Sequence, residues 1–302
     1  MNRREFVFQV GGLALTAWVA PAWAQPLQLP QSKKDRLAVG TLFMRYRFKQ
    51  TPRKPDEAIP NELTLLDVPA YYQKRFGIRK IEFWNQHFES LDPAYLGKLK
   101  DSIKAADCQL FDVQIDRISY NLADTDEEKR ARSVKDVKEW IDAVFFLGST
   151  CIRINPGSRG TVEKSIESLK ELNAYAKSKN LIIITANHFG IEMDPDKHVQ
   201  IVKGSGVHTE PDFGNYPHDD KLLSKLEKIV PYAYVISAKV DEFKIEDGKL
   251  DHVSYDFDKC VQLCERLGFK GTYMVAQWSS KPQDIDYEKV GDWVIEHVTK
   301  NI

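Results

Sequence analysis

The chain has 302 residues, of which 42% are hydrophobic and 29% are charged, and its formal net charge at pH 7 is −1. This length allows one large hydrophobic core, and the balanced charge excludes the strongly basic surface that nucleic-acid binding requires. Four widely spaced cysteines, none of them in a CxxC pair, argue against a disulfide scaffold and against a cysteine zinc site.

The first 24 residues have the pattern of an export signal. Two arginines at positions 3 and 4 precede a short apolar stretch, and the small-residue sequence AWA follows at 22–24. The apolar stretch is too short to span a membrane, so we expect a twin-arginine signal that engages the Tat export machinery and delivers a periplasmic protein. A buried N-terminal helix is the alternative. Residues 25–36 are expected to form a polar leader.

Eight short apolar runs follow, each succeeded by a longer amphipathic segment. They are LAVGTLF (37–43), RKIEFW (79–84), QLFDVQI (109–115), TCIRIN (150–155), LIIIT (181–185), GVHTEPDF (206–213), YAYVISAKV (232–240) and GTYMVAQW (271–278). Their average spacing of roughly 33 residues fits one strand plus one crossover helix. We therefore predict a single-domain α/β fold, a (β/α)8 TIM barrel over residues 37–302. An open doubly wound sheet is the alternative, but the first turn lacks a glycine-rich dinucleotide fingerprint.

Two of the amphipathic segments show how the helices should end. The segment SVKDVKEWIDAVFFLG (133–148) has apolar residues at three-to-four spacing and ends on Gly148, and FDKCVQLCERLGFKG (257–271) repeats this design around Gly268. Glycine at such a position favours the left-handed helix cap.

Polar residues at the carboxyl ends of the runs mark the expected site, because function in this fold gathers at that face of the barrel. In chain order they are Glu82, His87, Asp116, Arg117, Arg153, Asn155, Asn187, His188, Asp212, Asn215, Lys239, Gln277 and Trp278. The mixture of charges, amides and aromatic rings suits a polyhydroxylated small molecule, with Trp84 or Trp278 covering a sugar face. His208, His218 and His252 are interpreted as surface loop residues.

Six motifs carry a resemblance to a known family. The sequences NHFGIEMDPD, PDFGNYP, SAKVDEF and GFKGTYMVAQW resemble the fifth to eighth strand ends of the xylose-isomerase-like TIM-barrel sugar isomerase/epimerase family, and IEFWNQHF and LGSTCIRINPG resemble its second and fourth. The resemblance runs from about residue 37 to the C-terminus. It implies proton transfer beside a carbonyl, or a hydride shift, assisted by one divalent metal.

The metal ligands of that family are largely missing from this sequence. The resemblance implies a Glu on strand five, an Asp on strand six, a His on strand seven and a Glu on strand eight; here only Asp212 matches, and the other positions hold Ala186, Ser237 and Ala276. Alanine offers neither charge nor lone pair, so we expect no cofactor and at most a weakly bound divalent metal at Asp212.

Two hypotheses of function remain open. In the first, the protein is a sugar isomerase/epimerase-like enzyme acting on an unphosphorylated sugar or keto-glycoside, with Lys239 and Arg153 stabilising an enolate while His188, His87 or Glu82 moves the proton. In the second, it is a catalytically inactive periplasmic carbohydrate-binding protein. Phosphate is disfavoured because the loops after strands seven and eight lack a glycine-rich cradle.

The predicted roles are then as follows. Catalytic residues are His188, Lys239 and Glu82, and substrate-binding residues are His87, Arg153, Asn155, Asn187, Asn215, Gln277 and Trp278. A buried lysine is costly unless it is paired, so Lys239 is also expected to form a salt bridge to Asp212 or Glu82.

Overall fold

The computed structural model describes residues 33–51, 58–116, 119–247, 249–279 and 286–302. The expected signal over residues 1–24, most of the leader and Arg117 lie outside the described residues. No helix in the described part of the chain combines the length and the hydropathy that a membrane crossing requires.

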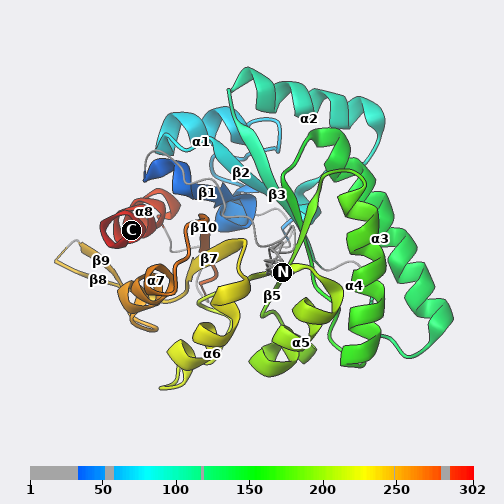
Figure 1. Ribbon diagram of the computed structural model, residues 1–302. Helices are drawn as coiled ribbons and strands as arrows, with labels where there is room; N and C mark the ends of the chain where they lie inside the picture. The colour runs from blue at the N-terminus through cyan, green and yellow to red at the C-terminus, as the bar shows by residue number, and fades with distance from the viewer. Residues whose placement is uncertain (1–32, 52–57, 117–118, 248, 280–285) are drawn as a thin grey trace, which may run out of the picture.

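Eight parallel strands form a nearly closed barrel (Figure 1). They are β1 (Leu37–Gly40), β2 (Lys80–Trp84), β3 (Gln109–Ile115), β4 (Cys151–Ile154), β5 (Ile182–Ala186), β6 (His208–Glu210), β7 (Val235–Val240) and β10 (Thr272–Gln277). The hydrogen-bonded order is β6-β5-β4-β3-β2-β1-β10-β7, and parallel bridges from Thr209 to Ala233 and from Asp212 to Ser237 join the two end strands. The predicted (β/α)8 barrel is therefore confirmed, and each strand lies inside its predicted run except β5, which extends one residue beyond it.

Helices surround the strands (Figure 1). They are α1 (Val68–Phe76), α2 (Pro93–Ala105), α3 (Glu127–Leu147), α4 (Val162–Lys177), α5 (Pro195–Ser205), α6 (Leu222–Ile229), α7 (Phe257–Arg266) and α8 (Tyr287–Asn301). Helix α3 begins where the carboxylate of Asp126 accepts hydrogen bonds from the N–H groups of Glu128 and Lys129, and it ends at Gly148, whose φ of 78° is left-handed as predicted. Short 3₁₀ segments η3 (Thr41–Arg47), η4 (Asn85–His87) and η5 (Gly190–Met193) follow β1, β2 and β5.

One element was not predicted from the sequence. An antiparallel hairpin of β8 (Phe243–Glu246) and β9 (Lys249–His252) is inserted after β7. The interpretation of His252 as a surface loop residue is wrong, since it ends β9 with 8% exposure and its ring lies 4.6 Å from that of Tyr255 and 5.8 Å from that of Trp293. Aromatic packing under the hairpin buries this histidine.

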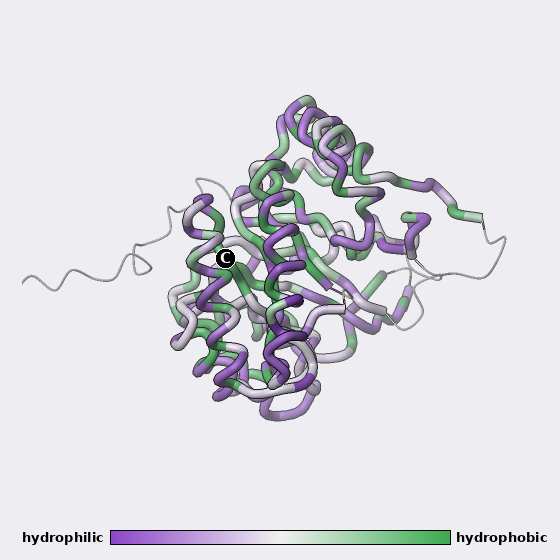
Figure 2. The backbone as a smooth tube through the Cα atoms, turned by 90° about the vertical axis from the view of Figure 1, so that its right-hand side faces the viewer, coloured by the Kyte–Doolittle hydropathy of each residue, from purple (hydrophilic) through white to green (hydrophobic). Residues whose placement is uncertain are grey.

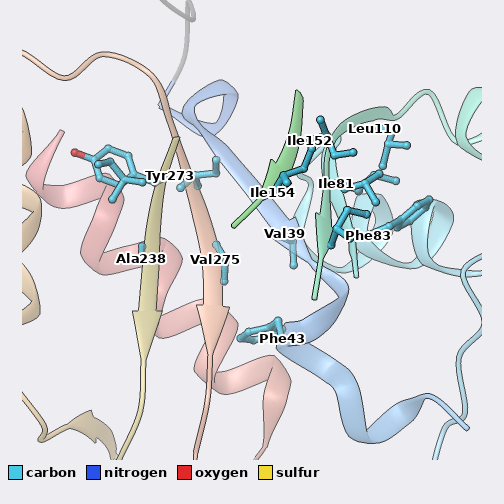
Figure 3. Close-up of a cluster of buried hydrophobic side chains, with 14 of the residues drawn as sticks. Val39, Phe43, Ile81, Phe83, Leu110, Ile152, Ile154, Ala238, Tyr273 and Val275 are labelled. Atoms are coloured by element: carbon cyan, nitrogen blue, oxygen red, sulfur yellow. The ribbon is translucent and has the colours of Figure 1, made fainter. Parts of the chain in front are cut away.

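The apolar core lies in two separate layers because successive side chains of a strand point to opposite faces. The outer layer joins strand residues to the helices, and Figure 3 shows part of it, including Val39, Ile81, Phe83, Ile152 and Val275. Figure 2 shows hydrophobic and hydrophilic residues alternating along the enclosing helices, as amphipathic packing requires. The inner layer contains strand residues alone: Ala38, Phe111, Cys151, Ile184, Val235 and Met274.

Candidate active site

The strand register gathers polar residues in the carboxyl-end half of the barrel interior. Alternate residues of each strand point to the same face of the sheet. The inward-pointing residues that follow the inner apolar layer along each strand therefore lie towards the carboxyl end of the barrel interior. The pairs of neighbours there are Gly40 with Glu82, Glu82 with Asp112, Gln114 with Arg153, Ala186 with Glu210, Asp212 with Ser237, and Ala276 with Lys239. Of the predicted polar ring, Glu82, Arg153, Asp212 and Lys239 thus lie in the carboxyl-end half of the barrel.

An ion pair between β7 and the end of β6 forms one side of this site. The ammonium nitrogen Nζ of Lys239 lies 3.2 Å from Oδ1 of Asp212, as the predicted salt bridge requires, and also donates to Oδ1 of Asn215. The other carboxylate oxygen of Asp212 accepts from the Ser237 hydroxyl at 2.8 Å, and the Gly214 N–H donates to Oδ1 at 2.9 Å. Both oxygens of Asp212 therefore have donors from the protein.

Asn187 fixes the backbone that carries Asp212. Its side-chain amide donates to the Asp212 carbonyl at 3.0 Å and accepts from the Asp212 N–H at 2.7 Å. Because this pair of bonds uses both ends of a fully buried amide, Asn187 holds the end of β6 in place. Its predicted contact with a substrate is untested.

Arg153 forms the opposite side of the site. Its guanidinium donates to the carboxylate of Asp116 at 2.7 Å and to that of Glu210 at 3.5 Å. Burial raises the pKa of Asp116, but the guanidinium of Arg153, the imidazole of His188 and the hydrogen bond from Gln114 together outweigh burial and hold the pKa below its usual value. Asp116 is therefore ionised beside a permanent cation.

His188 lies between these two sides, and Asn155 determines which nitrogen carries its proton. The amide oxygen of Asn155 accepts from the Ala186 N–H at 2.9 Å and from the Thr185 hydroxyl at 3.3 Å, which leaves the amide nitrogen to donate to Nδ1 of His188 at 3.5 Å. Neutral His188 therefore carries its proton on Nε2. Burial lowers its pKa to about 4, with the charges of Arg153 and Lys239 acting in the same direction, so the ring is neutral at pH 7.

A cluster of buried carboxyl groups lies one layer deeper. Burial and the neighbouring Asp112 raise the pKa of Glu82 well above its usual value, and burial raises that of Glu210 to about 8 against the opposing charge of Arg153. The bare Gly40 leaves room for this cluster, since a Cβ there would collide with Oε1 of Glu82. Burial therefore favours the protonated forms of the carboxyl groups around this guanidinium, and Glu210, with a pKa of about 8, retains its proton at pH 7.

Asp241, just past β7, is a further acid at this face that sequence reasoning missed. Its carboxylate lies 3.2 Å from Nε2 of His218, and a Cβ on Gly214 would be 3.0 Å from it and 2.6 Å from Cε of Lys239. Burial raises the pKa of Asp241 to about 7, with Lys239 opposing and Asp212 reinforcing the shift. The signal in the sequence was the alternation of residues 237, 239 and 241 on one face of the run SAKVD.

Glu210 and Asp112 were missed for a similar reason. Each interrupts an otherwise apolar run, GVHTEPDF or QLFDVQI, at the same alternate spacing as the site residues that follow it. A buried carboxyl within such a run requires a partner.

His87 does not lie open to the barrel mouth. Its ring stacks on that of Phe48 with centroids 3.8 Å apart, it meets the ring of Trp84 edge-on at 5.0 Å, and only 1% of the residue is exposed. Burial lowers its pKa to about 3. A contact between His87 and substrate stays a prediction.

The two predicted residues at the end of β10 differ in their surroundings. Gln277 is fully buried, donating to the Phe43 carbonyl at 2.7 Å and accepting from the Ser279 N–H at 2.9 Å, so it joins two loops. Trp278 is 42% exposed and its ring lies 4.1 Å from the guanidinium of Arg45. Only Trp278 presents a surface to solvent.

The four positions at which the resemblance implies metal ligands hold one carboxylate and three residues without strong donor groups. Asp212 already interacts with Lys239, while Ala186, Ser237 and Ala276 occupy the other positions. Over the described ranges, no three His, Cys, Asp or Glu side chains converge as a metal-binding set.

The nearly closed ring of parallel strands defines a (β/α)8-barrel protein, with charged residues gathered at the carboxyl ends of its strands. The model of the xylose isomerase-like TIM barrel family matches residues 71–297. The chain belongs to that family. No curated protein sequence gives a significant match.

Solved structures share the fold at low sequence identity. A D-psicose 3-epimerase in the presence of D-fructose has a TM-score of 0.63 at 12% identity, over 87% of this chain and 96% of its own. A 3-keto-D-glucoside 4-epimerase from E. coli has 0.59 at 12%, over 86% and 98%. A xylose isomerase-like protein from Mycobacterium smegmatis in complex with magnesium has 0.59 at 15%, over 88% and 97%. Sugar epimerases are therefore among the structural neighbours.

Proposed function

We propose that this protein is a sugar isomerase or epimerase that acts on an unphosphorylated sugar or keto-glycoside by proton transfer next to a carbonyl. We further propose that it works without a tightly bound divalent metal and that it is exported to the periplasm by a twin-arginine signal. The observation that carries the catalytic proposal is the convergence of the Lys239–Asp212 ion pair and the neutral His188 at the carboxyl face of the barrel.

The donor set argues against a resident divalent metal. A hard cation needs several oxygen or nitrogen ligands, and the carboxylate of Asp212 is here compensated by the ammonium of Lys239 and by two further donors. Residues 186 and 276 are alanines and supply no donor atom from their side chains. The residues present therefore fit a lysine cation, not a magnesium or manganese ion.

Proton transfer in such a site follows from the protonation states. The carboxylate of Asp241, with a pKa of about 7, takes the proton from the carbon beside the carbonyl. The C–H electron pair forms a C=C bond to the carbonyl carbon, and the π pair of the carbonyl moves to its oxygen. The ammonium of Lys239 and the Nε2–H of His188 stabilise the oxygen of the resulting enediolate. Donors placed in this way are each worth on the order of 10²- to 10³-fold in rate. Return of the proton to the opposite face, or to the neighbouring carbon, gives an epimer or an isomer.

The buried carboxyl cluster supports this site from below. Glu82 is only 3% exposed and lies on the layer beneath Arg153, so we assign it to holding the guanidinium in position instead of touching the substrate. Arg153 in turn keeps Asp116 ionised beside His188.

The nature of the substrate is supported by chemistry and by the neighbours. Amides, carboxylates and an ammonium group at the strand ends suit hydroxyl groups. A structural neighbour is named a 3-keto-D-glucoside 4-epimerase and another a D-psicose 3-epimerase, and neither name includes a phosphorylated sugar. Unphosphorylated sugars are also the form available outside the cytoplasm.

Incubation of the protein with a panel of ketoses and keto-glycosides in deuterated water tests the proposal. Deuterium incorporated at the carbon beside the carbonyl, and lost in a His188→Ala variant, is the expected result. Saturable binding without incorporation across the panel would instead identify a carbohydrate-binding protein without catalysis.

A further inference from the structure

Phe189 adopts a backbone conformation that a phenylalanine rarely adopts. Its φ of 56° and ψ of 161° lie next to the region that is essentially confined to glycine. The following residue, Gly190, is itself locked in place, since a Cβ there would be 2.7 Å from Cα of Ser158 and 2.9 Å from the Gly157 carbonyl oxygen. The loops after β5 and β4 are therefore in close contact next to Phe189.

Burial of the phenyl ring contributes little stabilisation to offset this backbone strain. Phe189 is 68% exposed, so most of its apolar surface stays in water. Among the residues that the structure describes, its one ring contact is with its neighbour His188, at 4.1 Å between centroids and a tilt of 59°. Glycine would suit the backbone better, and a polar residue would suit the exposure better, so stability does not explain a phenylalanine at this position.

The exposure of the side chains increases outward from the site. The Asp212 side chain is 4% exposed, the His188 side chain is 24% exposed, and Phe189 follows at the rim. A sugar ring that meets the Nε2–H of His188 therefore has Phe189 beside its outward end. The flat apolar face of a phenyl ring stacks on the C–H face of a sugar or on an aromatic ring.

We propose that Phe189 forms a second subsite that binds the substituent of a glycoside by ring stacking, so that the preferred ligand is a two-ring glycoside and not a free monosaccharide. This inference rests on the proposed function for its choice of a sugar ligand. The shared chemistry is a flat ring face, and it is provided either by a second sugar or by an aromatic aglycone.

Binding of unreactive probes tests this subsite without any need for turnover. Methyl β-D-glucoside, 4-nitrophenyl β-D-glucoside and cellobiose are titrated calorimetrically into the full-length protein. At least one ring-bearing probe is expected to bind about tenfold more tightly than the methyl glucoside, and Phe189→Ala is expected to remove that difference. Comparison of the aryl glucoside with cellobiose tells which kind of ring is preferred. Equal or undetectable binding of all three probes overturns the proposal.

Two variants separate the ring from the strained backbone. Phe189→Gly is expected to raise the Tm by about 2 °C or more because it relieves the backbone, whereas Phe189→Ala keeps a Cβ and is expected to leave the Tm unchanged or lower it. Both variants are expected to lose the preference for two-ring probes. A Phe189→Gly variant no more stable than Phe189→Ala overturns the argument from strain. If the binding preference holds but no deuterium exchange occurs with any substrate, the proposed enzymatic function fails while this subsite stands.

Discussion

Replacement of Lys239 by methionine tests whether its ammonium compensates the charge of Asp212. At the observed separation of 3.2 Å and an effective dielectric constant of about 20, the attraction is about 5 kcal/mol. The Ser237 hydroxyl and the Gly214 N–H remain as donors to the carboxylate. We therefore expect Lys239→Met to lower the free energy of unfolding by about 2–4 kcal/mol, near the lower part of the range for breaking a buried ion pair.

A double-mutant cycle with Asp212→Asn provides the control. When residue 212 is neutral, Lys239→Met no longer leaves a buried charge without its cation, so the expected loss falls below about 1 kcal/mol. Urea unfolding monitored by tryptophan fluorescence gives the four midpoints, and unchanged m-values would show that the unfolding transition is comparable. Equal losses in the two backgrounds would refute the pairing as the reason for a lysine at this position.

Four further predictions, at three residues, concern proton transfer and packing. If the carboxylate of Asp241 is the base, kcat/KM should fall about tenfold per pH unit below its pKa of about 7, and Asp241→Asn should abolish both the activity and this limb. Since the folded pKa of Asp241 lies above its ordinary value, its ionisation costs stability as the pH rises from about 4 to about 7, so Asp241→Asn should gain stability relative to the native protein at pH 8 and not at pH 4 in chemical unfolding. Asn155→Ala should lower kcat by about 10- to 100-fold, with a smaller effect on binding, because the hydrogen bond that fixes the tautomer of His188 is lost. An unchanged kcat would contradict this role of Asn155. Gly40→Ala should destabilise the protein by about 1–3 kcal/mol in a native background and less in Glu82→Ala, because the added methyl meets the Glu82 carboxyl.

The strands and the helix end at Gly148 followed from local sequence patterns. Alternation of apolar runs with amphipathic segments depends on residues close together in the chain, and Gly148 ends its helix through its own backbone freedom. The hairpin β8–β9 escaped prediction because the residues of KIEDGKLDH are mostly charged, and its packing depends on aromatic rings from distant segments. His252 was misplaced for the same reason.

The site itself was predictable only in part. A lysine at the end of an apolar run required a partner, so a pair with Asp212 or Glu82 was predicted, and the structure shows the pair with Asp212. The cluster of Glu82, Asp112 and Glu210 depends on the stagger between strands, including a register shift between Ile81 and Glu82 that no local pattern reveals. Contacts set by strand register across a barrel cannot be inferred from the spacing of residues along one strand.

The most direct test of the central claim is the rate at which solvent deuterium enters the carbon beside the carbonyl of a keto-glycoside, measured before and after treatment of the protein with a strong chelator. The account predicts a measurable rate that chelation leaves unchanged and that added magnesium or manganese does not increase, because Lys239 provides the cation. A rate that disappears on chelation and returns with the added metal would contradict it.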